Sequence, residues 1–294
     1  MQESSTLDYS LDHVIVFVDD LLAAEHSSST RLGLQVTSHA EHPGFGTQNA
    51  TIAFELGFIE LLTERDPGEL RSTRYGRLFL DRHARQGNGA AVFVLRTASF
   101  DRVIRDCRDR GGLCEDRLIG YSKLVGGEPR EWEAAFMPGT EPVYLDPRLP
   151  VLARTYPWPL KTPGVHPLGA NRLEGVVIAV DDLDDAVELY RVHFGLVARR
   201  TKDHVQAKVA QFSLHTSQQI VLAQPLSSKG ALATRISSVG DGIFAVMLRV
   251  ADASLGMAFW KRQRIQTEIH DWLGRYPVSD PTLEMGTRLA LVSL

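Results

Sequence analysis

The stretch LDHVIVFVDDLLAA, residues 11–24, returns as LEGVVIAVDDLDDA, residues 173–186, and this repeat decides the fold. In both copies an apolar run rich in β-branched residues predicts a buried strand. The Asp-Asp pair that follows predicts the start of a helix, because an aspartate side chain accepts hydrogen bonds from the free N–H groups of a first turn. The copies lie more than half the chain apart, so they indicate a duplicated half rather than a solenoid, whose repeats span roughly 20–50 residues. One position differs in chemistry: the first copy has His13 where the second has Gly175.

A weaker repeat lies inside each half. Residues 90–113 and 243–265, which begin AAVFVLRT and IFAVMLRV, again predict a strand, a polar turn and a helix. Strand-like segments follow each of the four units. After the first unit they include TQNATIAFE and GFIELLTER, which a short glycine-containing turn joins in the manner of a hairpin. After the second they are EWEAAFMP and EPVYLDP. The sequence therefore predicts one order of elements, a strand, a helix and three strands, repeated four times.

This organisation, with the motif His-Pro-Gly-Phe-Gly-Thr-Gln-Asn at residues 42–49, resembles the vicinal oxygen chelate superfamily (glyoxalase, bleomycin resistance and extradiol dioxygenase proteins) and its glyoxalase-like branch. The resemblance is good over the first half and into the third unit, and loose over the fourth. It implies an α+β fold in which four βαβββ modules form two half-open, cup-shaped sheets. We therefore expect a first glyoxalase-like domain over residues 1–150, a linker over 151–171 and a second, degenerate domain over 172–294.

The linker is expected to be ordered. Its sequence, RTYPWPLKTPGVHPLGAN, has four prolines and no helix or strand period. Its aromatic residues Tyr156 and Trp158 are expected to pack onto the cups, and His166 is expected to fix the connection between the halves. A fixed rather than flexible relation between the two domains follows.

Composition excludes several classes of protein. The 294 residues carry a formal net charge of −4, and the arginines of residues 102–110 alternate with aspartates, so no basic stripe for nucleic acid is predicted. No run of about 20 apolar residues predicts a membrane span, and the N-terminus lacks a signal-peptide pattern, so a cytoplasmic protein is expected. Cys107 and Cys114 are interpreted as free thiols of a reducing compartment. A small-molecule partner is expected, and a homodimer is compatible with the sequence.

Two polar residues are predicted to point into the first cup. Side chains alternate between the faces of a strand, so His13 shares one face with Leu11 and Ile15, and Glu60 shares one with Phe58 and Leu62. A carboxylate is almost never fully buried without a partner, so Glu60 is expected to meet a cation, a metal or a substrate proton. Even without metal, Glu60 is suited to act as a general base beside a carbonyl.

In the metal-using members of the superfamily the first strand of a module gives one ligand, often His, and the fourth gives Glu. The resemblance therefore implies that His13 and Glu60 are catalytic residues and metal ligands, with His42 completing a two-His, one-carboxylate set. Zn, Fe, Mn and Ni all suit such ligands, and the metal would act as a Lewis acid. The second half has Gly175 and Val221 at the corresponding positions, so no metal is expected from it.

The same residues have structural interpretations that the sequence leaves open. His13 also suits a hydrogen-bonded histidine at a strand start, and the module that follows offers only apolar candidates near Ala91 and Val143 or Tyr144. Substrate-binding roles are predicted for His42, Asn49 and Trp132. Each also has a structural alternative, as a loop histidine, a backbone partner and a core aromatic respectively.

Two classes of function remain open at this stage. The His13 and Glu60 pair favours an enzyme, a divalent-metal-assisted lyase or isomerase acting on a small substrate with vicinal oxygens. The missing ligands in the second module favour a metal-free protein that binds and sequesters a drug or metabolite. A ring-cleaving dioxygenase is less favoured, because in that group the ligands lie in the second pair of modules.

Overall fold

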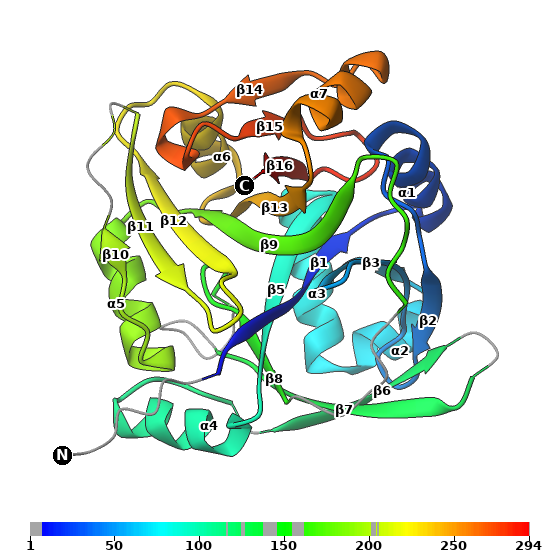
Figure 1. Cartoon of the computed structure of the whole chain (residues 1–294). Coiled ribbons are helices and arrows are strands. Elements are labelled where there is room, and N and C mark those ends of the chain that lie inside the picture. The colour runs from blue at the N-terminus through cyan, green and yellow to red at the C-terminus, as the bar shows by residue number, and fades with distance from the viewer. Residues whose placement is uncertain are drawn as a thin grey trace.

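The computed structural model describes residues 8–115, 117–124, 127–137, 146–154, 162–200, 204 and 206–293. It contains the predicted order of elements four times (Figure 1). The first half comprises β1 (Ser10–Phe17), α1 (Leu21–Ser27), β2 (Ser38–His42), β3 (Thr47–Ala53) and β4 (Phe58–Glu64), then β5 (Gly89–Thr97), α4 (Phe100–Asp109), β6 (Leu118–Leu124), β7 (Pro129–Ala135) and β8 (Val151–Arg154). The second half comprises β9 (Ala170–Ala179), α5 (Leu183–Phe194), β10 (Arg199–Arg200), β11 (Ala207–Ser213) and β12 (Gln219–Pro225), then β13 (Gly242–Val250), α7 (Ala253–Arg262), β14 (Thr267–Ile269), β15 (Pro277–Ser279) and β16 (Arg288–Val292).

Additional helices join the two modules of each half. They are α2 (Pro67–Ser72) and α3 (Arg74–Gln86) in the first half and α6 (Ala231–Val239) in the second. Among the described residues, no helix has the length and apolar character that a membrane crossing needs.

The repeated Asp-Asp pairs start helices as predicted. Asp20 caps α1 by accepting a hydrogen bond from the backbone N–H of Ala23 at 3.0 Å. Asp182 caps α5 by accepting from the N–H groups of Asp184 and Asp185. Because each cap fixes where its helix leaves the preceding strand, both halves fold back over their sheets in the same way.

The predicted α+β architecture of two cup-shaped sheets is confirmed. The first sheet closes into a barrel in the order β1-β4-β3-β2-β6-β7-β8-β5, and the second is an open eight-stranded sheet in the order β10-β11-β12-β9-β13-β16-β15-β14. Closure of the first depends on the pairing of β2 with β6, where Ala40 lies opposite Leu124. In each half the first strand runs parallel to the fourth and antiparallel to the first strand of the next module.

The barrel extends beyond residue 150. Its last strand, β8, lies within the range 151–171 that the prolines suggested was linker, and it pairs with β5 through Val151 and Val94. The sequence predicts this strand earlier in the chain, at EPVYLDP. Residues 138–145 of the chain, including Val143 and Tyr144, lie outside the described part. Tyr156 and Trp158 lie outside it as well.

Buried polar side chains hold the halves together. The His166 ring, 6 % exposed, accepts a hydrogen bond at Nδ1 from the Gln35 N–H (3.0 Å) and donates from Nε2 to the Ala53 carbonyl (3.1 Å). This agrees with its expected role at the connection. Gln218, fully buried, donates to the carbonyls of Leu11 and Leu173 and accepts from the Leu11 N–H, each at 2.9 Å. Figure 1 shows where these copies of the repeated strand meet: β9 lies against β1 and β4, and β13 lies against β5.

We predict that His166 makes the stability of the protein sensitive to acid. Burial lowers the pKa of His166 despite its bond to Ala53, so the unfolded chain takes up this proton first as the pH falls below about 6.5. The contribution of His166 to the free energy of unfolding is therefore complete above that pH and declines below it.

Urea unfolding at pH 7.5 and 5.5 tests this prediction. His166→Gln, which can still accept and donate but does not titrate, should lose less stability between the two pH values than the parent protein. An identical loss in both proteins would contradict it.

Candidate functional site

The barrel brings His13 and Glu60 together. They lie on the adjacent parallel strands β1 and β4, whose register places His13 opposite Phe58 and Ile15 opposite Glu60. The His13 Nε2 atom lies 3.4 Å from Glu60 Oε2. Glu60 is 6 % exposed, and the His13 ring stacks on Phe58 with 4.3 Å between ring centroids. The two residues that strand alternation assigned to one face therefore share one polar centre.

The His-Pro-Gly-Phe-Gly-Thr-Gln-Asn motif adds two more residues to this centre. It forms the turn between β2 and β3, so His42 and Asn49 come from adjacent antiparallel strands. The His42 Nε2 atom lies 3.6 Å from Glu60 Oε1, and the Asn49 amide donates a hydrogen bond to that same oxygen. The Asn49 Nδ2 atom also lies 3.3 Å from His42 Nε2. The structure thus brings four of the five predicted site residues into contact.

A glycine fixes the turn of the motif. Gly46 has a positive φ of 68°, and a Cβ on it would lie 2.4 Å from the backbone nitrogen of Leu70. Its carbonyl accepts hydrogen bonds from the N–H groups of Arg65 and Asp66. Because α2 packs this closely against the turn, only glycine fits at position 46. This backbone packing fixes the turn that follows His42.

Both histidines turn the same ring nitrogen toward Glu60. The Nδ1 atom of His13 lies 2.8 Å from Asp12 Oδ2, and the Nδ1 atom of His42 lies 2.9 Å from Thr47 Oγ1. A partner at Nδ1 fixes the ring orientation and leaves Nε2 for chemistry. Burial lowers the pKa of His13, but hydrogen bonds and charge from Asp12 and Glu60 outweigh it, so the net pKa is raised.

Asp12 owes its position to a β-bulge. The pairing of β1 with β5 shifts register between Leu11 and His13, and Asp12 is the extra residue. Its Oδ1 atom accepts a hydrogen bond from Arg96 Nη1 at 3.2 Å, while its other oxygen meets His13. Arg96 thus holds a carboxylate that in turn orients the imidazole.

The second half repeats the bulge without the histidine. The register of β9 against β13 shifts between Gly175 and Leu173, and Glu174 accepts a hydrogen bond from Arg249 at 2.7 Å. Glu174 and Arg249 correspond to Asp12 and Arg96. Asp12 is a site residue that strand alternation does not indicate, although an acidic residue at this point of both repeats and an arginine in both LRT and LRV are signals for it.

Trp132 contributes to the wall of the barrel. It lies on β7, and its ring contacts Phe45 of the motif turn, with 5.3 Å between centroids. Beside it, the strand pairing places Val92 and Val151 of the second module where the first module has His13 and Glu60. An apolar cluster packs beside Trp132 and includes Phe17, Leu62, Leu70, Phe79, Val94 and Ala134.

Among its described residues, the second sheet offers no equivalent centre. Gly175 and Val221 occupy the positions of His13 and Glu60, as the register of β9 with β12 shows. A Cβ on Gly175 would lie 2.3 Å from the Gln219 carbonyl oxygen and 3.2 Å from the Met247 sulfur, so no larger side chain fits.

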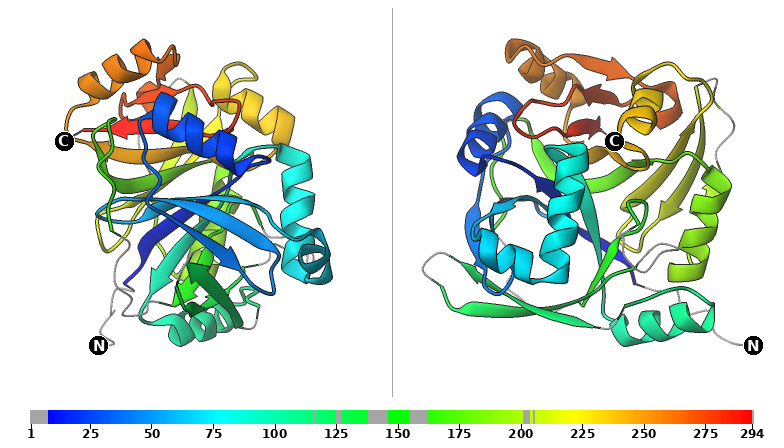
Figure 2. Two further views of the ribbon diagram at one scale, coloured as in Figure 1. Left: turned by 90° about the vertical axis from the view of Figure 1, so that its right-hand side faces the viewer. Right: turned by 180° about the vertical axis from the view of Figure 1, so that it is seen from behind.

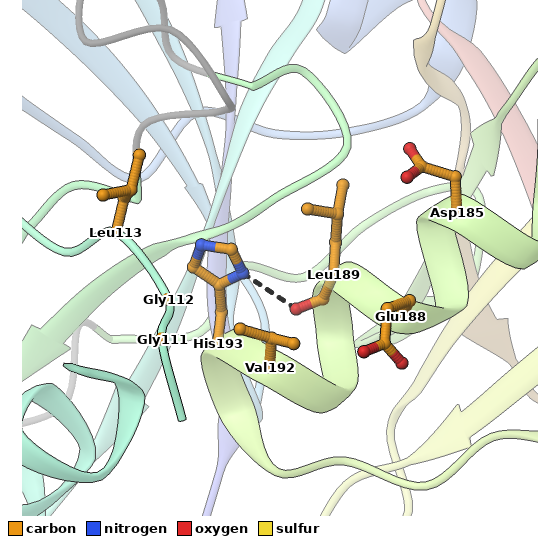
Figure 3. Close-up of a pocket in the computed structure, with 8 residues that line it drawn as sticks. All are labelled: Gly111, Gly112, Leu113, Asp185, Glu188, Leu189, Val192 and His193. Atoms are coloured by element: carbon orange, nitrogen blue, oxygen red, sulfur yellow. Dashed lines mark hydrogen bonds between the residues drawn. The ribbon is translucent and has the colours of Figure 1, made fainter. Parts of the chain in front are cut away.

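A separate cavity of about 290 Å³ lies at the junction of the halves (Figure 3). It is lined by residues 111–113 and by the α5 residues Asp185, Glu188, Leu189, Val192 and His193. The His193 Nδ1 atom donates a hydrogen bond to the Leu189 carbonyl, and burial lowers the pKa of the His193 ring. None of the residues predicted for the site lines this cavity.

The chain matches the model of the glyoxalase-like domain over residues 11–194, more than half of its length. Its fold is similar to a hypothetical protein from Staphylococcus aureus (11 % identity, TM-score 0.65, covering 97 % of this chain and 100 % of that one). It is also similar to a 4-hydroxymandelate synthase mutant from Streptomyces coelicolor (13 % identity, TM-score 0.65, covering 97 % and 92 %).

A third similar structure is a xylose isomerase-like TIM barrel/4-hydroxyphenylpyruvate dioxygenase fusion protein (16 % identity, TM-score 0.62), where the match covers 98 % of this chain and 48 % of that one. No curated protein matches the sequence significantly. The family match and the four βαβββ modules together confirm the resemblance: the protein belongs to the glyoxalase-like domain family of the vicinal oxygen chelate superfamily.

Proposed function

We propose that the protein is an enzyme, an isomerase or lyase, that acts on a small molecule with two adjacent oxygen atoms. Its active site would be the polar centre of the first barrel, with a divalent transition metal held by His13, His42 and Glu60. The observation that carries this proposal is that both imidazoles direct Nε2 at one buried carboxylate.

The donor atoms fit such a metal in kind. Two imidazole nitrogens and a carboxylate suit zinc, iron, manganese and nickel, and partners at both Nδ1 atoms are typical of histidine ligands. The Asn49 Oδ1 atom is buried and makes no hydrogen bond to the described residues, so the centre holds a further oxygen donor. As they stand, the described side chains do not surround one shared point: the carboxylate lies between the rings. When bound, the metal would supply Lewis-acid polarisation of the substrate oxygens.

The chain itself would provide proton transfer and exclusion of water. Without the metal, Glu60 is placed to accept a proton from a carbon next to a carbonyl, and protonated His13, whose pKa is raised, is placed to donate one at Nε2. With the metal bound, Nε2 of His13 would be a ligand atom and carry no proton. Asp12 would position His13 without touching substrate. Phe17 and Phe79, whose ring centroids lie 4.2 Å apart, belong to the apolar cluster that would exclude water.

One observation favours a second candidate, a metal-free protein that binds and sequesters a small molecule. The Asn49 amide already contacts both Glu60 and His42, so the centre has internal hydrogen bonds without an ion. A ring-cleaving dioxygenase is less favoured. The similarity to the dioxygenase fusion protein concerns the fold, and Gly175 and Val221 offer no ligand atoms in the second sheet.

We predict that metal retention depends on the first barrel alone. Metal analysis of the purified protein should find about one equivalent of a transition metal. Glu60→Ala and His13→Ala should each lower the affinity at least tenfold, because each removes a donor. Val221→Ala, at the position of Glu60 in the second sheet, is the matched control and should retain the metal. Equal retention by all four proteins would contradict the site, and no metal under any loading condition would favour the binding protein.

We also predict that Asp12 sets the protonation of His13. Asp12→Asn should lower the pKa of His13, because the raising effect of its charge is lost, and NMR titration of the His13 ring protons measures this. Because partners of ligating histidines affect metal binding, the variant should also weaken it by roughly 10–100-fold. Asp12→Glu should restore part of both effects. Glu174→Gln, the equivalent change in the second half, should alter neither, and an unchanged His13 pKa in Asp12→Asn would reject the role.

A further inference from the structure

Two arginines occupy equivalent positions in the two halves. Arg82 on α3 and Arg235 on α6 each stand seven residues before the glycine that opens the following strand, Gly89 in β5 and Gly242 in β13. Seen from behind in Figure 2, α3 (cyan) rises beside α6 (gold). The duplication therefore brings two copies of one position to the junction of the halves.

Their guanidinium groups converge on the same point. The Nη2 atoms of Arg235 and Arg82 lie 2.8 Å and 3.5 Å from the position that a Cβ would take on Gly242. Gly242 has a positive φ of 137° and no side chain, and a Cβ there would meet the Arg235 guanidinium, so the glycine lets both guanidinium groups approach its backbone. The Cβ of Pro147 closes the third side at 3.4 Å.

Both positive charges are poorly compensated. Burial lowers the pKa of Arg82 to about 10, with the charge of Arg235 as the second cause, and burial also lowers the pKa of Arg235. Within the described part of the chain, neither forms an ion pair. Arg235 donates to the Gly240 carbonyl at 2.7 Å, and Arg82 makes no hydrogen bond to the described residues. Two partly buried like charges near one another cost free energy, which Asp146 and Asp241 offset in part and a bound anion would offset further.

The nearby carboxylates are engaged elsewhere. Both oxygens of Asp146 accept hydrogen bonds from Arg148, at 2.9 and 2.7 Å, and Arg148 also pairs with Asp185 at 2.6 Å and Asp241 at 3.6 Å. The Oδ1 atom of Asp241 accepts from the Asp181 N–H. Asp146 and Asp241 attract Arg82 and Arg235 only at longer range. Their negative charges would repel a highly charged ligand, so the position suits a small anion.

We propose that Arg82 and Arg235 form a binding site for a small oxyanion, a phosphate group or a carboxylate, at the junction of the two halves. Guanidinium groups match the geometry of such anions with two parallel hydrogen bonds each. A bound anion would connect α3 of one half to α6 of the other. The site is separate from the barrel centre, and it stands or falls independently of the metal.

Thermal unfolding with inorganic phosphate, at constant ionic strength set with chloride, tests the proposal. Phosphate should raise the unfolding temperature of the parent protein in a saturable way, because it binds only the folded state. Arg82→Met and Arg235→Met should each weaken phosphate binding at least tenfold. Arg77→Met, an exposed position on the same helix, should leave the response unchanged.

A variant that removes the repulsion also tests the proposal without phosphate. Arg82→Met should then be no less stable than the parent protein. If Arg82 had a structural role instead, the substitution would lower the free energy of unfolding. Arg82→Lys, which keeps the charge but loses the planar fork, provides a folded variant if Arg82→Met does not fold, and it should weaken phosphate binding. An unchanged phosphate response in both Arg82 variants would overturn the proposal. In the parent protein, calorimetry with acetate and with glycerol phosphate distinguishes a carboxylate site from a phosphate-ester site, and binding of neither would also contradict the proposal.

Discussion

The burial of the Glu60 carboxylate is the constraint on which the site depends. A carboxylate that is 6 % exposed needs partners, and the barrel supplies two imidazoles and an amide from three different strands. Each imidazole is fixed in turn by a further contact, His13 by Asp12 and His42 by Thr47. The result is a preorganised polar centre in an apolar interior, the setting in which electrostatic effects on a substrate are strongest.

Duplication explains both the stability of the frame and the difference between its halves. Gln218 joins the equivalent residues Leu11 and Leu173, so one buried amide ties the two copies of the repeated strand together. The bulge with its acid–arginine pair occurs in both copies, as Asp12 with Arg96 and as Glu174 with Arg249. The acid–arginine pair is therefore a feature of the duplicated module. The first half combines this pair with His13. In the second half, the remaining oxygen of Glu174, Oε2, forms an ion pair with Arg172, whose Nε atom lies 3.1 Å away.

The fold could be predicted from the sequence because its signals are local and repeated. The apolar runs and the Asp-Asp caps of the first and third units predict a strand and a helix in each of them, and strand alternation correctly placed His13 and Glu60 on one face. Asp12 could not be placed in this way. A bulge adds one residue to the pairing, so its side chain departs from the alternation that the prediction assumes. The end of the barrel was missed for a related reason, because the prolines around Val151–Arg154 are typical of linkers and the strand itself is short.

The central claim is that His13, His42 and Glu60 form one metal centre. The most direct measurement is anomalous X-ray scattering from crystals of the protein soaked in zinc or manganese. If these three residues hold one metal, a single strong anomalous peak should lie in the first barrel, in contact with both Nε2 atoms and the Glu60 carboxylate, and none should lie beside Gly175. An empty barrel centre, with the hydrogen bond from Asn49 to Glu60 intact at saturating metal, would contradict it.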